Sequence, residues 1–148
     1  IGQLDDAGLA VHEAAHAVGR HPHRLTVPLQ KRIQPADLRG MRVIASPEST
    51  PFGQTLRRAF GAAGADMHRD FECTSSTTAC WFAQAGVGVA VVDQVAIAGG
   101  LLAGLEVRPF RSTEKLPVRL IRNRYRPMSV VERAFVEAFD GVWATIAQ

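Results

Sequence analysis

The residues best suited to chemistry near the start of the chain are His12, Glu13 and His16, in the run HEAAH. This run matches the HExxH pattern, in which two histidines on one face of a helix bind zinc and the glutamate acts as general base. Catalytic zinc usually takes a third protein ligand, but His21 and His23 both miss the spacing of the extended motif. We favour a polar helix that carries two histidines without a metal, and keep a zinc metallopeptidase-like protein as the alternative.

Hydroxyl side chains form a second group with chemical potential, because they follow segments that we predict as strands. The run 46–50 (SPEST) follows one such segment, the five hydroxyl residues 74–78 follow another, and Asp93 follows a third. Hydroxyls and the N–H groups of helix N-termini can bind a carboxylate, and an acidic side chain can bind an ammonium group. The structural alternatives are helix capping for the hydroxyls and a turn for Asp93. The predicted ligand-binding residues are Ser46, Ser49, Thr50, Thr74, Ser75, Ser76, Thr77 and Asp93.

The elements that must position these residues alternate between strands and helices from residue 42 onward. Apolar runs predict the strands, and capping residues followed by helical spacing of apolar residues predict the helices. This alternation predicts an α/β fold with a mostly parallel sheet and helices on both faces, in which the strands end at one common edge. In order, we predict a strand at 42–45, a helix from Pro51 that Gly64 ends, a strand at 68–73, a helix at 79–85, a strand at 89–92, short strands at 105–107 and 118–121, and a helix at 129–146.

Composition limits the classes of function that the chain can serve. Of its 148 residues 47% are hydrophobic, and its net charge of +3 is too small for a dedicated nucleic-acid binder. The arginines at 119, 122, 124 and 126 leave weak nucleic-acid binding as a third hypothesis. The apolar run 85–105 carries Asp93, which would cost about 3 kcal/mol in a bilayer, so we expect no membrane span. Cys73 and Cys80 fit no zinc or redox pair and no signal peptide is evident, so we expect a cytoplasmic protein without a cofactor.

Four stretches of the sequence together resemble LysR-type transcriptional regulators. They are RIQPADLRGMRVIASPESTPFGQTLRRAFGAAGA, FECTSSTTACWFAQAGVGVAVVD, LEVRPF and the closing RPMSVVERAFVEAF. The resemblance is to the second lobe of the effector-binding domain and the return segment after it, and it implies a truncated lobe of the periplasmic-binding-protein type 2 fold. It also implies a regulator rather than an enzyme, one that forms homo-oligomers and contacts DNA only through a helix-turn-helix domain that this chain lacks. The polar groups described above suggest that its small-molecule effector is a carboxylate or amino-acid-like.

The first 32 residues are the least patterned part of the chain. The run HAVGRHPHRLTVPLQ does not have the pattern of a strand, although the family has a strand at this point. We therefore interpret residues 1–32 as a poorly patterned remnant of the first lobe or hinge. Residues 33–148 then form the effector-binding domain, that is, the second lobe with a C-terminal return strand and helix.

The final helix carries a broad apolar face. Ser129 and Glu132 predict a capping box at its start. In the family this helix packs on the lobe that is mostly missing here, so we expect the face to be incompletely covered and the chain to self-associate or be marginally stable. The face consists of Val131, Ala134, Phe135, Ala138, Val142 and Ile146, widened by Phe139 and Trp143.

Overall fold

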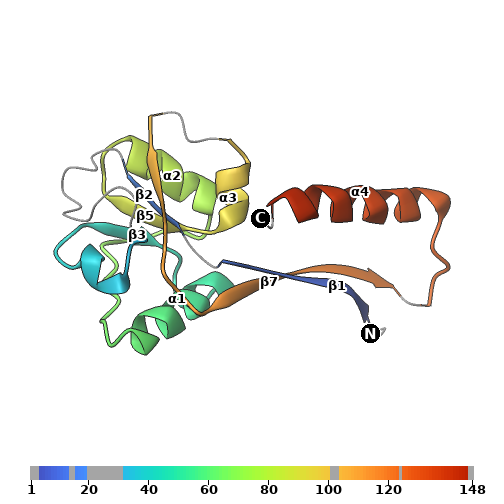
Figure 1. The fold of residues 1–148 in the computed structure, drawn as a ribbon, viewed down its shortest axis with the longest axis horizontal. Coiled ribbons are helices and arrows are strands. Elements are labelled where there is room, and N and C mark those ends of the chain that lie inside the picture. Colours follow the sequence, from blue (N-terminus) through green and yellow to red (C-terminus); the bar gives the residue numbers. More distant parts are fainter. Residues whose placement is uncertain (1–3, 14–15, 20–31, 101–103, 124, 147–148) are drawn as a thin grey trace. The chain divides into compact units, whose positions relative to one another are not determined.

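The computed structural model of the chain describes residues 4–13, 16–19, 32–100, 104–123 and 125–146 (Figure 1). The chain divides into two compact units. The larger is formed by Glu13–Leu116, and the smaller by Ile1–His12 together with Pro117–Gln148.

A five-stranded sheet organises the larger unit. Its strands are β2 (His16–Gly19), β3 (Val43–Ala45), β4 (Phe71–Glu72), β5 (Val89–Val92) and β6 (Glu106–Pro109), in the spatial order β4-β3-β5-β2-β6. Strand β3 pairs in parallel with β4 and β5, whereas β2 pairs antiparallel with β5 and β6. Four strands therefore share one direction and β2 opposes them, which confirms the mostly parallel sheet predicted from the sequence.

Helices cover both faces of this sheet, as predicted. Successive strand residues point to opposite faces, and α1 (Pro51–Ala62) packs on one face while α2 (Ser76–Gln84) packs on the other (Figure 1). The short helix α3 (Gln94–Ala98) and the 3-10 turn η2 (Pro35–Leu38) complete the unit. The α1 cluster includes Val43, Ala45, Val91, Leu56 and Phe60, and the α2 cluster Ile44, Ala90, Val92, Ala79, Cys80 and Ala83.

Local signals in the sequence located the helix ends well, with one exception. The Thr50 side chain accepts a hydrogen bond from the Gly53 N–H at the start of α1, and Gly64 has the positive φ (62°) that follows its end. Helix α2 begins three residues before the predicted Ala79, because Ser75 is its N-cap. The strand predicted at 68–73 shortens to the two residues of β4.

The beginning of the chain is where the sequence-based prediction was wrong. Residues 4–13 form strand β1 (Leu4–Glu13), and His16–Gly19 form β2, which pairs with β5 on one side and β6 on the other. The run HAVG therefore is a strand, inside the sheet, although its local pattern did not show it. A four-residue segment carries too little periodicity to be recognised, and its pairing partners lie more than 70 residues further along the chain.

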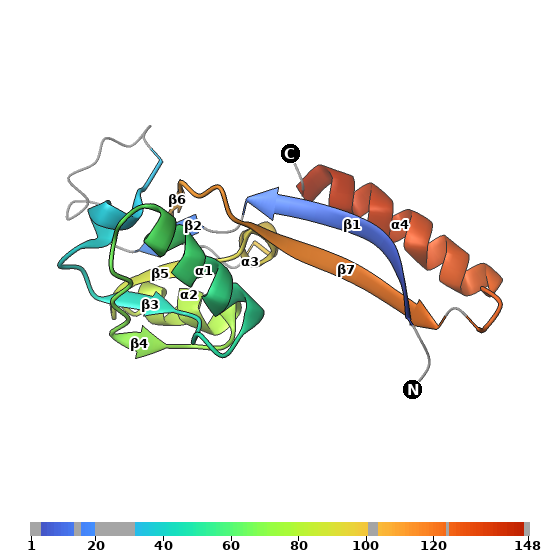
Figure 2. The same ribbon diagram turned by 90° about the horizontal axis from the view of Figure 1, so that it is seen from below.

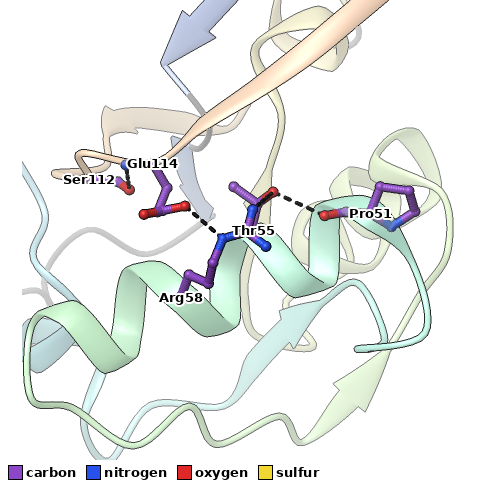
Figure 3. Close-up of polar contacts among 5 residues, drawn as sticks. All are labelled: Pro51, Thr55, Arg58, Ser112 and Glu114. Carbon is purple, nitrogen blue, oxygen red and sulfur yellow. Dashed lines mark hydrogen bonds and ion pairs between the residues drawn. The ribbon is translucent and has the colours of Figure 1, made fainter.

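The return segment after β6 is attached to α1 by polar contacts (Figure 3). The Arg58 Nε atom lies 2.8 Å from a carboxylate oxygen of Glu114, and its Nη2 donates to the buried Thr55 hydroxyl at 3.2 Å. Thr55 in turn donates to the Pro51 carbonyl, and Glu114 N–H donates to Ser112. Because the Arg58 side chain is half exposed, the ion pair itself contributes at most about 1 kcal/mol and chiefly fixes orientation.

The smaller unit contains little besides a two-stranded ribbon and one helix. Strands β1 and β7 (Lys115–Asn123) run in opposite directions (Figure 2), and α4 spans Val130–Ile146. The predicted capping box is present, since Glu132 N–H donates to the Ser129 hydroxyl and Ser129 N–H to the Glu132 carboxylate. Among the described residues, no helix is long and apolar enough to cross a membrane.

Candidate functional site

The carboxyl ends of the three parallel strands β3, β4 and β5 bring the predicted polar segments together. Beyond β4 the pairing with β3 continues, because Cys73 N–H donates to the Ala45 carbonyl at 3.0 Å. The segment after β4 then meets the segment after β5, where the Ser76 hydroxyl donates to the Asp93 carboxylate at 2.5 Å. At this sheet edge the segments after β4 and β5 are therefore in contact, and the loop after β3 begins at the same edge because β3 is parallel to both strands.

The N-terminus of α2 lies at this edge and carries two serines with different hydrogen-bonding capacities. Ser75 accepts a hydrogen bond from Thr78 N–H at 3.3 Å, which leaves its own hydroxyl proton able to donate. Ser76 donates its only hydroxyl proton to Asp93, so it can offer a ligand only acceptor lone pairs. Of the neighbouring threonines, Thr74 is exposed and Thr77 half-buried.

Asp93 connects two helix N-termini. One of its carboxylate oxygens accepts from Ser76, and the other accepts from Ala96 N–H at 3.1 Å, which caps α3. Asp93 is thus a helix cap rather than the turn residue considered above, and each carboxylate oxygen keeps a further lone pair for a ligand.

The loop after β3 is held firmly against the first turn of α1. The Thr50 hydroxyl donates to the Pro47 carbonyl at 2.8 Å while it accepts from Gly53 N–H at 3.0 Å. Ser46 is buried, whereas Ser49 is exposed. Among the three hydroxyl residues of this loop, only Ser49 is exposed to solvent.

Gly53 is the residue at this edge that the sequence analysis missed. A Cβ atom at Gly53 would overlap the carbonyl oxygen of Pro47, so only glycine lets the loop approach the helix this closely. The available signal was a glycine in the first turn of a helix, where glycine is unfavourable unless packing requires it.

Cys80 also lies near this edge but is unsuited to nucleophilic chemistry. Burial raises the pKa of the Cys80 thiol, and the negative charge of Asp93 raises it further. A thiol kept protonated and buried behaves as a small apolar side chain.

The zinc alternative requires His12 and His16 to lie on one face of a helix, and the structure does not place them on a helix. His12 and Glu13 end strand β1, and His16 begins strand β2, so the two histidines do not share one helical face. In the part of the chain that the structure describes, no group of three or more histidine, cysteine or acidic residues is arranged to hold a metal ion.

Comparison with known proteins matches this fold and sequence to one family. The family model described as the LysR substrate binding domain matches residues 7–144, which begins well before residue 33, where the sequence resemblance started. The transcriptional activator protein LysR of Escherichia coli (strain K12) is 31% identical over 119 residues, which are 80% of this chain and 36% of that protein. The chain thus spans about a third of the length of this curated relative.

Solved structures share the fold at lower sequence identity. The effector domain of AmpR of Pseudomonas aeruginosa matches 98% of this chain and 66% of its own, with a TM-score of 0.65 and 20% identity. The effector-binding domain of QuiR in complex with shikimate matches 90% of this chain and 62% of its own, with a TM-score of 0.65 and 12% identity. Full-length CbnR in complex with target DNA matches 90% of this chain and 46% of its own, with a TM-score of 0.69 and 18% identity. The chain accordingly belongs to the LysR substrate binding domain family, with an α/β fold of the periplasmic-binding-protein type 2 kind.

Proposed function

We propose that this chain is the effector-sensing module of a cytoplasmic LysR-type transcriptional regulator and not an enzyme, and that its effector is a small carboxylate or amino-acid-like molecule. The single observation that carries the proposal is the position of three polar segments at the carboxyl edge of β3, β4 and β5, where the Ser76–Asp93 hydrogen bond joins two of them. Ligands of open α/β sheets bind at this kind of edge. The regulator would contact DNA through a helix-turn-helix domain outside this chain and would form homo-oligomers.

The chemistry of the edge supports a carboxylate at the start of α2. A helix leaves its first N–H groups without intrahelical partners, and its dipole favours negative charge there. The Ser75 hydroxyl adds a donor beside them. The acceptor pair made by Ser76 and Asp93 lies next to these donors and would receive an ammonium or hydroxyl group of the same ligand. A molecule with a carboxylate and an adjacent hydrogen-bond donor would bind both the donors at the start of α2 and the acceptors of Ser76 and Asp93.

A thermal-shift series on the full chain tests the proposal. Wells contain small carboxylates, amino acids, shikimate, zinc or a chelator, and binding to the native state raises the unfolding transition. A ligand at about one hundred times its Kd stabilises the native state by about 2.7 kcal/mol. We expect stabilisation by at least one carboxylate and none by zinc.

Two variants locate the binding. Ser75→Ala together with Ser76→Ala should abolish the shift, because both hydroxyls are removed. Ser75→Asp is the sharper change, since aspartate still caps α2 but places a negative charge where the carboxylate would bind. The matched control is Ser129→Asp, the same replacement at the N-cap of α4, which should leave the shift intact. Unchanged ligand stabilisation in Ser75→Asp would refute this site.

A further inference from the structure

A cleft lies at the edge of the sheet opposite the proposed effector site. The cleft, of about 430 Å³, opens where β3 begins, between the segment 35–43 and the segment 65–70 that follows α1. This volume is in the range of small-molecule sites. Strand β3 separates the cleft from Ser46, and three extended residues span about 10 Å, so the cleft is distinct from the proposed effector site.

The cleft has an apolar floor. Leu38, Val43 and Phe60 line it, and each is only 3% exposed. Half-buried Met41 extends this surface. An apolar group of a ligand would therefore meet a preformed, rigid surface, because these side chains belong to the packed α1 cluster.

One wall of the cleft is basic. Arg39 and Arg42 line it, and both are exposed. Arg42 uses Nη2 in one long hydrogen bond of 3.4 Å to the Gly86 carbonyl, and the guanidinium of Arg39 makes no hydrogen bond or ion pair within the described residues. Most of the guanidinium donors on this wall are therefore available to an anion.

Two acidic residues, Asp66 and Asp70, also line the cleft, and the carboxylate of Asp70 already has partners. Asp70 accepts Val43 N–H at 2.8 Å with one oxygen, and its other oxygen lies 3.3 Å from His68 Nε2. Asp70 thus fixes the start of β3. Because the lining holds two carboxylates as well as two arginines, a ligand with one negative charge is favoured over a ligand with two.

We propose that this cleft is a second ligand site, which binds a small monocarboxylate with an apolar body. The carboxylate pairs with Arg39 and Arg42, and the apolar body rests on Phe60 and Met41. A site at the amino end of β3 gives the module a second input, separate from the effector edge at the carboxyl end of the same strand.

The test is a titration of the ¹⁵N-labelled full chain with phenylacetate, followed by NMR. We expect the amide signals of 39–43 and 66–70 to shift together and to give one Kd. Arg39→Gln with Arg42→Gln should raise that Kd about tenfold or more, since charge-assisted hydrogen bonds are lost. The matched control Arg133→Gln, an exposed arginine of α4, should not change it.

Additional titrations distinguish the cleft from the effector edge and from nonspecific binding of anions. Ser75→Asp, which disables the proposed effector site, should leave the cleft titration unchanged, so each proposal can fail without the other. Acetate should bind more weakly than phenylacetate, and succinate should not bind better. The proposal is overturned if the cleft signals do not shift, if the double arginine variant binds equally well, or if acetate matches phenylacetate.

Discussion

Helices α1 and α4 are both capped and amphipathic, but the apolar face of α1 is buried whereas apolar residues of α4 are exposed. In the larger unit, Leu56 and Phe60 of α1 are 0% and 3% exposed, because the sheet packs against them. In the smaller unit, Phe135 and Val142 of α4 are 58% and 62% exposed. An apolar stripe therefore predicts that a helix needs a partner, but it does not show that the partner is present.

The exposed face of α4 is consistent with what the sequence led us to expect. Val131 and Phe135 are exposed to solvent. The rings of Phe135, Phe139 and Trp143 stack in a row, with centroids 6.2 Å apart for the first pair and 5.6 Å for the second. Stacking within the helix shields part of the aromatic surface only. Self-association through this face stays a prediction, since apolar patches of this kind commonly mark contacts with other chains.

The largest expected effect on stability comes from removing a buried side chain of α1, for comparison with an exposed one of α4. Leu56→Ala should lower the free energy of unfolding of the larger unit by about 2–5 kcal/mol, because it leaves a cavity in a closed core. Hydrogen exchange of the β3 and β5 amides measures the stability of this unit.

The matched change on α4 is Phe135→Ala, which should leave the exchange of β3 and β5 amides unchanged and should reduce self-association in light scattering. A loss of stability in the larger unit as great as that of Leu56→Ala would show that the contrast between the helices is wrong.

A smaller effect is expected where α1 meets the loop of the candidate site. Gly53→Ala should destabilise the larger unit by about 1–3 kcal/mol, because the added methyl group has to displace the backbone at Pro47. The unfolding temperature should fall, and the increase in that temperature caused by the ligand should become smaller.

Gly61→Ala is the control within the same helix. Apart from its chain neighbours and the backbone of its own helix, nothing lies within 4 Å of a Cβ added there, so alanine should stabilise α1 by about 0.5–1 kcal/mol. If both variants lost stability equally, the close approach of the loop to Gly53 would not be the cause.

The smallest effect concerns the start of α4 and its dependence on pH. The backbone N–H of Ser129, followed by the Ser129 side chain, holds the pKa of Glu132 below its ordinary value of 4.5. A lowered pKa in the folded state means that the contribution to stability is present above the ordinary pKa and is lost as the pH falls through the folded value. We expect the helicity of α4, followed by NMR, to decline in that acidic range.

Glu132→Gln isolates the charge, because glutamine can keep the capping box but does not titrate. In the Glu132→Gln variant the helicity of α4 should not depend on pH in that range. By contrast, Ser129→Ala removes the N-cap hydroxyl and should lower the stability of α4 by about 1 kcal/mol at neutral pH. An unaltered acidic decline in Glu132→Gln would assign the effect to another group.

Local signals were enough for several parts of this molecule. The N-caps Thr50 and Ser129, the stop at Gly64 and the apolar run of β5 each depend on a few neighbouring residues, so the sequence alone placed them. The order of these elements, with its strands and helices alternating, also predicted the α/β fold and the sheet edge where the polar loops meet.

Only the tertiary structure decided the features that depend on distant partners. His12 and Glu13 lie in strand β1 and His16 in strand β2, rather than on a helix, because each strand pairs with a segment far along the chain and a local pattern of a few residues does not outweigh that pairing. The Ser76–Asp93 hydrogen bond likewise joins segments that are distant along the chain, and the requirement for Gly53 follows from the path of the preceding loop, which the sequence pattern does not specify. Capping and periodicity act within one turn of the chain, whereas strand pairing and burial act across it, and the second kind of interaction fixed both the sheet and the site.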